Sequence, residues 1–220
     1  RISGAAWPQL FNRVIAQTMR VNIQRVGLPA WTDADQAMAR AVQRLAGSPD
    51  SGLAAHVDSL RAPRRPEEFR GGGSDDIGDV SWNVPTVTLR YPSNIPNLPG
   101  HNWSNGIAMA TPLAHKGATA GAKVLAMTML DFFLQPALVD SAWSYFRTVQ
   151  TRTVQYRPLL RPEDRPATWM NAEVMARLRP QMQRFYYDPS RFGSYLEQLG
   201  ITYPQIPAAG AACPAPGARP

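Results

Sequence analysis

The stretch GATAGAKVLAMTMLDFFL, residues 117–134, predicts the strongest helix of the chain. Small residues fill its first turns, and bulky apolar residues then recur at the short spacings of a helix that packs against other elements. These apolar residues are Val124, Leu125, Met127, Met129, Leu130, Phe132 and Phe133. A helix with this much apolar surface needs neighbouring elements to cover it, so we expect it to share a core with the helices and strands around it.

Two helices are predicted upstream of this stretch. Residues 7–26 carry an apolar residue every four positions, at Phe11, Ile15, Met19 and Ile23, and Gly27 is placed to end the helix. Thr32 followed three positions later by Asp35 forms an acidic variant of a capping box, which predicts the start of a second helix over 33–46. A further helix is expected from about residue 138 to 149.

A strand is predicted between these helices. The segment VSWNVPTVTLRY, residues 80–91, alternates well enough for a strand, although Pro85 makes it an edge strand or an irregular one. We therefore expect the helices to pack on a sheet that contains residues 86–90. The predicted fold class is α/β, a mixed sheet flanked by helices.

Composition narrows the possible classes of protein. The 220 residues suffice for one sizeable domain, and 44% hydrophobic with 18% charged residues is typical of a soluble globular protein. Cys213 is the single cysteine, which excludes a disulfide scaffold or a Cys-rich zinc site within these residues and favours a cytoplasmic setting. The net charge of +7 comes from scattered arginines, with no basic run longer than Arg64-Arg65, so we expect no nucleic-acid binding. The shortness of the uninterrupted apolar stretches argues against a membrane span.

The chain changes character after Tyr156. Proline-rich segments such as RPLLRPEDRP surround one short predicted helix at 171–179. We interpret residues 157–220 as an extension that wraps a neighbouring surface and ends in a disordered tail.

An acidic loop stands in GGGSDDIGDVSW, residues 71–82. Asp75, Asp76 and Asp79 could bind a metal ion or orient a metal-bound histidine, or they could form caps and Asx turns before the strand. The residue pattern alone leaves both interpretations open. The glycine run 71–73 lacks the lysine and the glycine spacing of a phosphate-binding loop.

The three histidines differ in their surroundings. His56 lies in a predicted short helix and is expected to be a surface or packing residue. His101 stands in LPGHNWSNG, a glycine-flanked loop where ligands often bind. His115 stands in PLAHKGATAG, just before the predicted start of the apolar helix, where free N–H groups attract anions.

Three motifs in order resemble a known family. The segments GSDDIGDVSWNVPTV (73–87), HNW (101–103) and LAHKGATAGAKVLAMTMLDFF (113–133) are similar to the C-terminal half of zinc-dependent amidohydrolases and carboxypeptidases, the metallopeptidase family of aminoacylases. The closest branch is the B-subunit type of aminobenzoyl-glutamate hydrolase. The resemblance covers about residues 7–150, including NIQRVGLPAWTDADQAMARAVQ (22–43). It implies a zinc-exopeptidase-like catalytic domain over 28–156, preceded by a helix, 1–27, that returns from the lid or dimerisation domain.

The resemblance also implies a site and a reaction. Members bind two metal ions, zinc or manganese, and hydrolyse the amide bond of an N-acyl amino acid, a dipeptide or an aminobenzoyl-glutamate-like substrate. His101 would be a metal ligand, and His115 and Trp103 would contact substrate. Asp76 and Asp79 would shape the site without coordinating strongly. The expected partner is a second copy, as a homodimer, or a related subunit in a hetero-oligomer.

This sequence departs from the family pattern in four respects. It lacks the C-G-H segment, the Glu-Glu pair and the lid histidine of the family's N-terminal half, and Asn102 stands where Ser or Thr is usual. A catalytic metal needs about three protein ligands, so these residues alone are expected to be an inert fragment. The alternative is a catalytically dead binding partner or a truncated remnant of the same fold.

Overall fold

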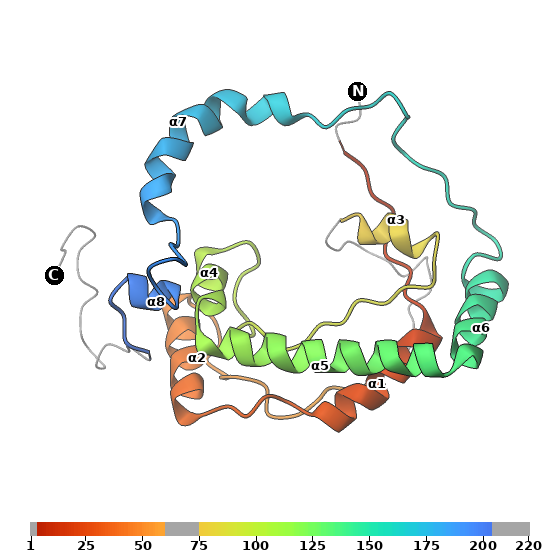
Figure 1. The fold of residues 1–220 in the computed structure, drawn as a ribbon, viewed down its shortest axis with the longest axis horizontal. Coiled ribbons are helices and arrows are strands. Elements are labelled where there is room, and N and C mark those ends of the chain that lie inside the picture. Colours follow the sequence, from red (N-terminus) through yellow and green to blue (C-terminus); the bar gives the residue numbers. More distant parts are fainter. Residues whose placement is uncertain (1–3, 60–74, 204–220) are drawn as a thin grey trace. The chain divides into compact units, whose positions relative to one another are not determined.

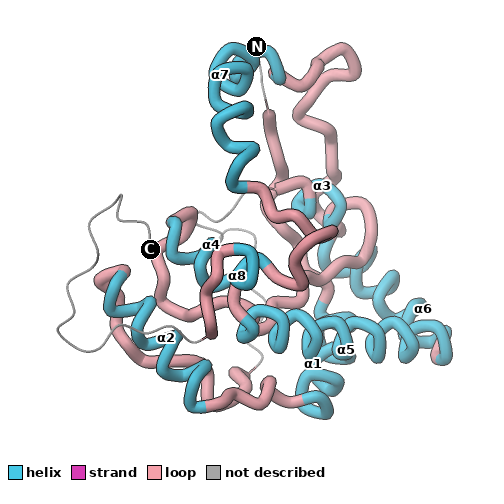
Figure 2. The backbone as a smooth tube through the Cα atoms, turned by 60° about the vertical axis from the view of Figure 1, so that its left-hand side comes forward, coloured by secondary structure: helices cyan, strands magenta, loops and turns pink. Residues whose placement is uncertain are grey.

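The computed structural model describes residues 4–59 and 75–203, and there the secondary structure is helical (Figures 1 and 2). The α-helices are α1 (Arg13–Val26), α2 (Asp33–Leu45), α3 (Ile77–Ser81), α4 (Trp103–Met109), α5 (Pro112–Leu134), α6 (Pro136–Tyr145), α7 (Ala172–Met182) and α8 (Tyr195–Gln198). A π-helical turn, η2 (Phe146–Gln150), extends α6, and the 3-10 turns η3 (Thr168–Asn171) and η4 (Gln183–Phe185) flank α7.

The chain divides into two compact units, each assembled from pieces distant in the sequence. Unit 1 contains residues 1–27, 56–91 and 119–186, and unit 2 contains 28–55, 92–118 and 187–220. The first turns of α5 belong to unit 2 and the rest of that helix to unit 1. The domain boundaries at residues 27 and 156 stay a prediction.

The predicted mixed α/β sheet is wrong. Over the described residues, the extended segment that follows α3 makes one isolated parallel bridge, between Phe11 and Thr86, and no named strand (Figure 2). The main-chain N–H of Asn12 donates to the carbonyl of Thr86 at 2.7 Å. Pairing cannot continue past this bond, because α1 begins at the next residue. Pro85, beside the bridge, has no N–H to donate to a partner strand.

The helices predicted over 7–26, 33–46 and 117–134 exist, but two of them begin elsewhere. The helix predicted over 7–26 begins at Arg13, because the Asn12 side chain caps it by accepting from the N–H groups of Val14 and Ile15. The capping box of α2 is confirmed, with Thr32 and Asp35 bonded reciprocally. The helix predicted over 117–134 begins five residues earlier, at Pro112.

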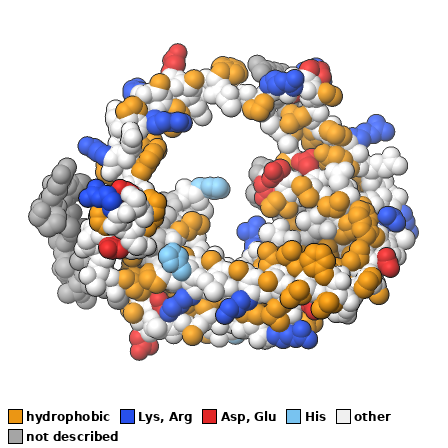
Figure 3. All heavy atoms as spheres, viewed as in Figure 1, with side chains coloured by type: hydrophobic (Ala, Val, Ile, Leu, Met, Phe, Trp, Pro, Cys, Tyr) orange, Lys and Arg blue, Asp and Glu red, His pale blue; other side chains and the backbone are white. Residues whose placement is uncertain are grey.

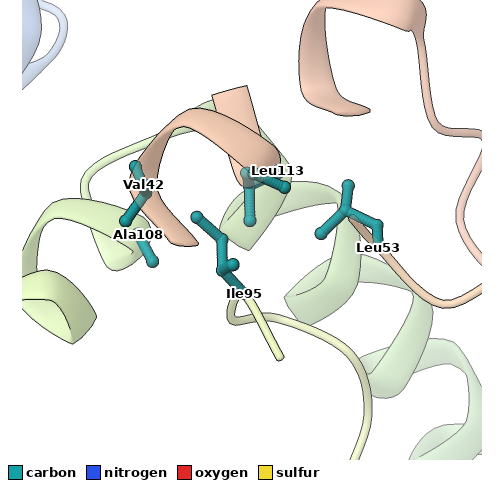
Figure 4. Close-up of a cluster of buried hydrophobic side chains, with 6 residues drawn as sticks. Val42, Leu53, Ile95, Ala108 and Leu113 are labelled. Atoms are coloured by element: carbon teal, nitrogen blue, oxygen red, sulfur yellow. The ribbon is translucent and has the colours of Figure 1, made fainter. Parts of the chain in front are cut away.

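Unit 2 has a small apolar core (Figure 4). Its buried members come from α2, α4, the start of α5 and the loops beside them. They are Ala39, Val42, Leu53, Ile95, Ala108 and Leu113. Buried Gln43 ties two loops to this core. Its side-chain amide donates to the carbonyls of Gly52 and Pro96 and accepts from the N–H of Gly52.

The short helix predicted near His56 is not formed, because residues 51–59 form loop.

Unit 1 is held by buried amide side chains between packed helices. Asn12, fully buried, donates to the carbonyl of Ala142 in α6 at 3.0 Å and to the side chain of Gln150 at 2.8 Å. Asn22 in α1 donates to Thr128 and Asp131 of α5. These buried amides are satisfied only when the helices adopt one arrangement, so the bonds set how α1 lies against α5 and α6.

Helix α5 is apolar well beyond the part that the chain buries. Val124 is fully buried, whereas exposed apolar side chains gather along its second half (Figure 3). These are Leu125, Met129, Leu130, Phe133 and Leu134. Among the described helices α5 alone is long and apolar enough to cross a membrane, a property that core helices of soluble proteins share.

The proline-rich extension contains the expected short helix. It is α7, observed at Ala172–Met182, close to the predicted 171–179. Residues 157–167 before it are mostly irregular, in keeping with their prolines and their lack of an apolar period. The predicted disordered tail, Cys213, the pair Arg64-Arg65 and the glycine run 71–73 lie outside the described residues.

Candidate functional site

His101 stands in unit 2, in the turn just before α4, in a conformation that L-residues seldom adopt. Its φ is +51°, in the left-handed region, and its side chain is exposed. A non-glycine residue in this region costs about 1 kcal/mol or more, so the surrounding structure must hold it there. Such an outlier at an exposed histidine motivates the hypothesis of a ligand-binding role.

Two asparagines hold this loop. Asn102 is the N-cap of α4, and its side-chain oxygen accepts from the N–H of Ser104 at 3.0 Å and from the Ser104 hydroxyl at 2.8 Å. Asn105 donates to the carbonyl of Pro99 at 2.6 Å and accepts from the side chain of Asn94 at 2.8 Å. Asn, Ser and Thr are all good N-caps. The departure from the family pattern at Asn102 therefore preserves a capping residue.

The two predicted substrate contacts lie in helices of the same region. Trp103 is the first residue of α4 and about half exposed. The sequence places His115 before a helix start, but α5 already begins at Pro112, so His115 lies exposed near the end of the first turn. It remains near the positive end of the helix dipole. It does not stand before the free N–H groups, and that part of the prediction is wrong.

The described part of the acidic loop lies in unit 1, where Asp79 links α3 to Trp7 and to Tyr156. One of its carboxylate oxygens accepts from the N–H of Trp7 at 3.2 Å, and the other accepts from the Tyr156 hydroxyl at 2.8 Å. This hydrogen bond to the Asp79 carboxylate raises the pKa of Tyr156. Asp76 occupies the N-cap position of α3 without a side-chain capping bond, and Asp75 accepts from Gln9.

The rest of the GDVSW segment also holds the extended residues before α1 in place. The Ser81 hydroxyl accepts from the N–H of Leu10 and donates to the carbonyl of Gly78, and the Trp82 indole donates to the carbonyl of Pro8. The ring of Trp7 packs against those of Trp82 and Tyr156, at centroid distances of 5.0 and 5.6 Å. These contacts give most of the motif a structural role.

A complete metal site is not assembled by the described residues. Within residues 4–59 and 75–203, no group of three or more His, Cys, Asp or Glu side chains is placed to hold a metal ion. His101, Trp103 and His115 belong to unit 2, whereas Asp76 and Asp79 belong to unit 1.

The sequence motifs do not predict the most buried ion pair among the described residues, which joins Asp35 to Lys116. Asp35, 1% exposed, accepts from the ammonium group of Lys116 at 2.5 Å, and its other oxygen accepts from the Tyr203 hydroxyl at 2.9 Å. The main chain and hydroxyl of Thr32 complete its partners. One clue was available: Lys116 is one of two lysines in a chain whose positive charge is otherwise arginine. The compact ammonium of lysine suits a single buried carboxylate oxygen.

Acid should weaken this network. Burial raises the pKa of Asp35, but the hydrogen bonds from Lys116, Thr32 and Tyr203 outweigh burial and lower it from 3.8 to about 2. Because the folded pKa is below the unfolded one, the stabilisation is present above about pH 4 and lost as the pH falls towards 2. We expect Asp35→Asn to remove about 2 kcal/mol of the acid-induced loss between pH 5 and pH 2. Urea denaturation at both values measures this, and an unchanged pH dependence in the variant would contradict it.

Comparison with known proteins finds a partial similarity to one hydrolase. The chain is a distant partial homologue of one subunit of that enzyme. The relative is the B subunit of p-aminobenzoyl-glutamate hydrolase from Escherichia coli (strain K12), 28% identical over 161 residues, a match that covers 64% of this chain and 34% of the relative. The chain therefore spans about a third of that relative's length. No protein-family model and no solved structure matches it.

Proposed function

We propose that this chain is part of a metal-dependent amidohydrolase. Its substrate would carry an amide bond like that of an N-acyl amino acid, a dipeptide or aminobenzoyl-glutamate. The observation that carries the proposal is the similarity to a hydrolase component whose name specifies p-aminobenzoyl-glutamate. The ordered motifs at 73–87, 101–103 and 113–133 support the same assignment.

In this proposal His101 binds one of two divalent ions, zinc or manganese. Its strained backbone, the Asn102 cap and the Asn105 bonds hold an exposed imidazole in a fixed loop, which is what a metal ligand requires. The described residues do not fit a complete metal site, so the remaining ligands would have to come from polypeptide outside them.

His115 and Trp103 are proposed to contact the substrate. The exposed imidazole of His115, near the positive end of α5, would donate a hydrogen bond to a substrate carboxylate. The exposed indole of Trp103 would wall the site and exclude water. Asp76 and Asp79 are proposed to border a metal site without coordinating strongly, and both Asp79 oxygens already accept hydrogen bonds.

The proposed assembly is a homodimer or a hetero-oligomer with a related polypeptide, in the cytoplasm. The relative is named as one component of a multi-subunit hydrolase, which supports an oligomer. The single cysteine, Cys213, suits a reducing compartment.

Substituting each histidine in the complete protein tests the assignment. We expect His101→Ala to lose about one equivalent of bound metal and to lower the rate of p-aminobenzoyl-glutamate hydrolysis about 100-fold. His115→Ala should keep its metal and raise KM, because it loses a substrate contact. Metal analysis of the purified protein and product chromatography measure the two quantities.

His56→Ala is the matched control. His56 is exposed in a loop and is assigned no role, so its variant should keep both metal and rate. Full metal content and activity in both His101→Ala and His115→Ala would refute the site. A complete protein that binds p-aminobenzoyl-glutamate without cleaving it would instead identify a binding component.

A further inference from the structure

Helix α5 carries apolar side chains on all of its sides. Val124 is fully buried, whereas Met127 and Phe132 are half-buried. Five further large side chains are between 47% and 76% exposed, and we call them the apolar α5 face: Leu125, Met129, Leu130, Phe133 and Leu134 (Figure 3). Helices that are apolar all round lie in the core of a larger protein or cross a membrane.

The polar contacts of α5 favour a protein core over a membrane. Asn22 of α1 donates to Thr128 and Asp131 of α5, at 3.2 and 2.6 Å. A membrane-spanning α5 would carry Lys123 and Asp131, together with the bonded helix α1, into lipid. Charged side chains in lipid are costly. The apolar α5 face is therefore better suited to contact with protein.

An apolar groove continues this face within unit 1. It has a volume of about 300 Å³ and lies between α1, α5 and the extended residues 85–87. Its lining residues are Ile15, Met19, Pro85, Thr86, Val87, Leu125, Thr128, Met129 and Phe132. Because Leu125 and Met129 belong both to the groove and to the apolar α5 face, one partner surface would cover the two together.

The area of the face argues against a second copy as its partner. The five exposed side chains present of the order of 500 Å² of apolar surface, which is large for a single patch on a monomer. A stable interface takes about 800 Å² from each partner. A segment of the same polypeptide needs less area, because the chain connection already keeps it near the face.

The comparison with known proteins supplies such a segment. The match covers 34% of the hydrolase relative, so about two thirds of a polypeptide of that kind lies beyond these residues. A longer chain buries a larger share of its surface than a short one. Apolar side chains that this part of the chain leaves exposed are therefore expected to become core in the whole.

We propose that the apolar α5 face, with its groove, is the docking surface for polypeptide from the remaining two thirds of the hydrolase. That polypeptide contributes an apolar layer which completes the core around α5. The proposal rests on the proposed function in one respect, that the chain is part of a longer hydrolase. It requires no metal ion, no substrate and none of the histidines.

Cysteine labelling of the complete protein tests this docking surface. Leu130→Cys places a thiol on the apolar α5 face, and Leu45→Cys at the end of α2 is the matched control, because the two leucines are 56% and 57% exposed. Each variant is treated with a maleimide, natively and in urea, and peptide mass spectrometry gives the rate at the substituted position. We expect folding to slow labelling at position 130 about 100-fold or more, and at position 45 less than about tenfold.

Three results would overturn the proposal. The first is labelling at position 130 that is as fast in the folded complete protein as at position 45. The second is protection that appears only as light scattering shows dimers forming, which would make a second copy the partner. The third is a natural protein of only 220 residues, by intact mass. Labelling measures no activity, so protection at position 130 in a complete protein that cleaves no amide would refute the proposed function alone.

Discussion

Replacing Asp35 by alanine is expected to lower the free energy of unfolding by about 2–3 kcal/mol. The change leaves the ammonium group of Lys116 without its buried carboxylate and removes the capping box of α2 and the acceptor of Tyr203. The loss stays below that of a fully buried pair, because the Lys116 side chain is 34% exposed and its ammonium group keeps the carbonyl of Ala30 as a partner. Urea denaturation at pH 7, followed by circular dichroism, measures the loss.

The control is Asp33→Ala, in the same first turn of α2. Asp33 is exposed, so its removal should cost about 0.5 kcal/mol or less. A double variant, Asp35→Leu with Lys116→Met, should recover part of the stability because it removes both charges. Equal losses in Asp35→Ala and Asp33→Ala would mean that the network contributes nothing beyond helix capping.

Replacing Gly78 by alanine is expected to cost about 3 kcal/mol, at the upper end for overpacking. An added Cβ would collide with the carbonyl oxygen of Trp7 and lie 2.8 Å from its carbonyl carbon. Both groups belong to the backbone, so α3 or the amino-terminal segment must move. That movement would also break the bond from Trp7 to Asp79. Thermal unfolding, with the near-ultraviolet circular dichroism of the tryptophans, measures the loss of packing.

Gly106→Ala provides the comparison. A Cβ at Gly106 in α4 meets nothing within 4 Å, and alanine is the better helix former. This variant should be neutral or stabilising by up to about 1 kcal/mol. A Gly78→Ala protein as stable as Gly106→Ala would contradict the close approach of α3 to Trp7.

Local signals account for the helices that could be predicted. The Thr32–Asp35 pair specifies the start of α2 because a capping box is made by residues three positions apart. The apolar stretch at 117–134 predicts α5 for a similar reason, since its periodicity lies within a few turns of one helix. The apolar pattern does not reach back to the true start at Pro112, although proline at the first position of a helix is favourable.

The residues of the candidate site could be named from the sequence. Their backbone conformation and their contacts could not. The motif at 101–103 predicts a role for His101. The positive φ of His101 and the capping bond of Asn102 are seen only in the structure. The GDVSW segment is predicted from its resemblance to border a metal site. Most of it bonds Trp7, Pro8 and Leu10, which lie more than 70 positions away in the chain, and its place beside a metal site stays a prediction.

The sequence by itself determined α2 with its capping box and most of α1, α5 and α6, because these depend on neighbours within a few positions. It did not predict the starts of α1 and α5 or the short helices α3 and α4. Only the tertiary structure decided the absence of a sheet among the described residues. A strand requires a second extended segment, and the one that reaches Thr86 enters α1 after Asn12. Only the tertiary structure also places Lys116 and Tyr203 beside Asp35, 81 and 168 positions away in the chain. A buried carboxylate needs such hydrogen-bond partners wherever the fold supplies them.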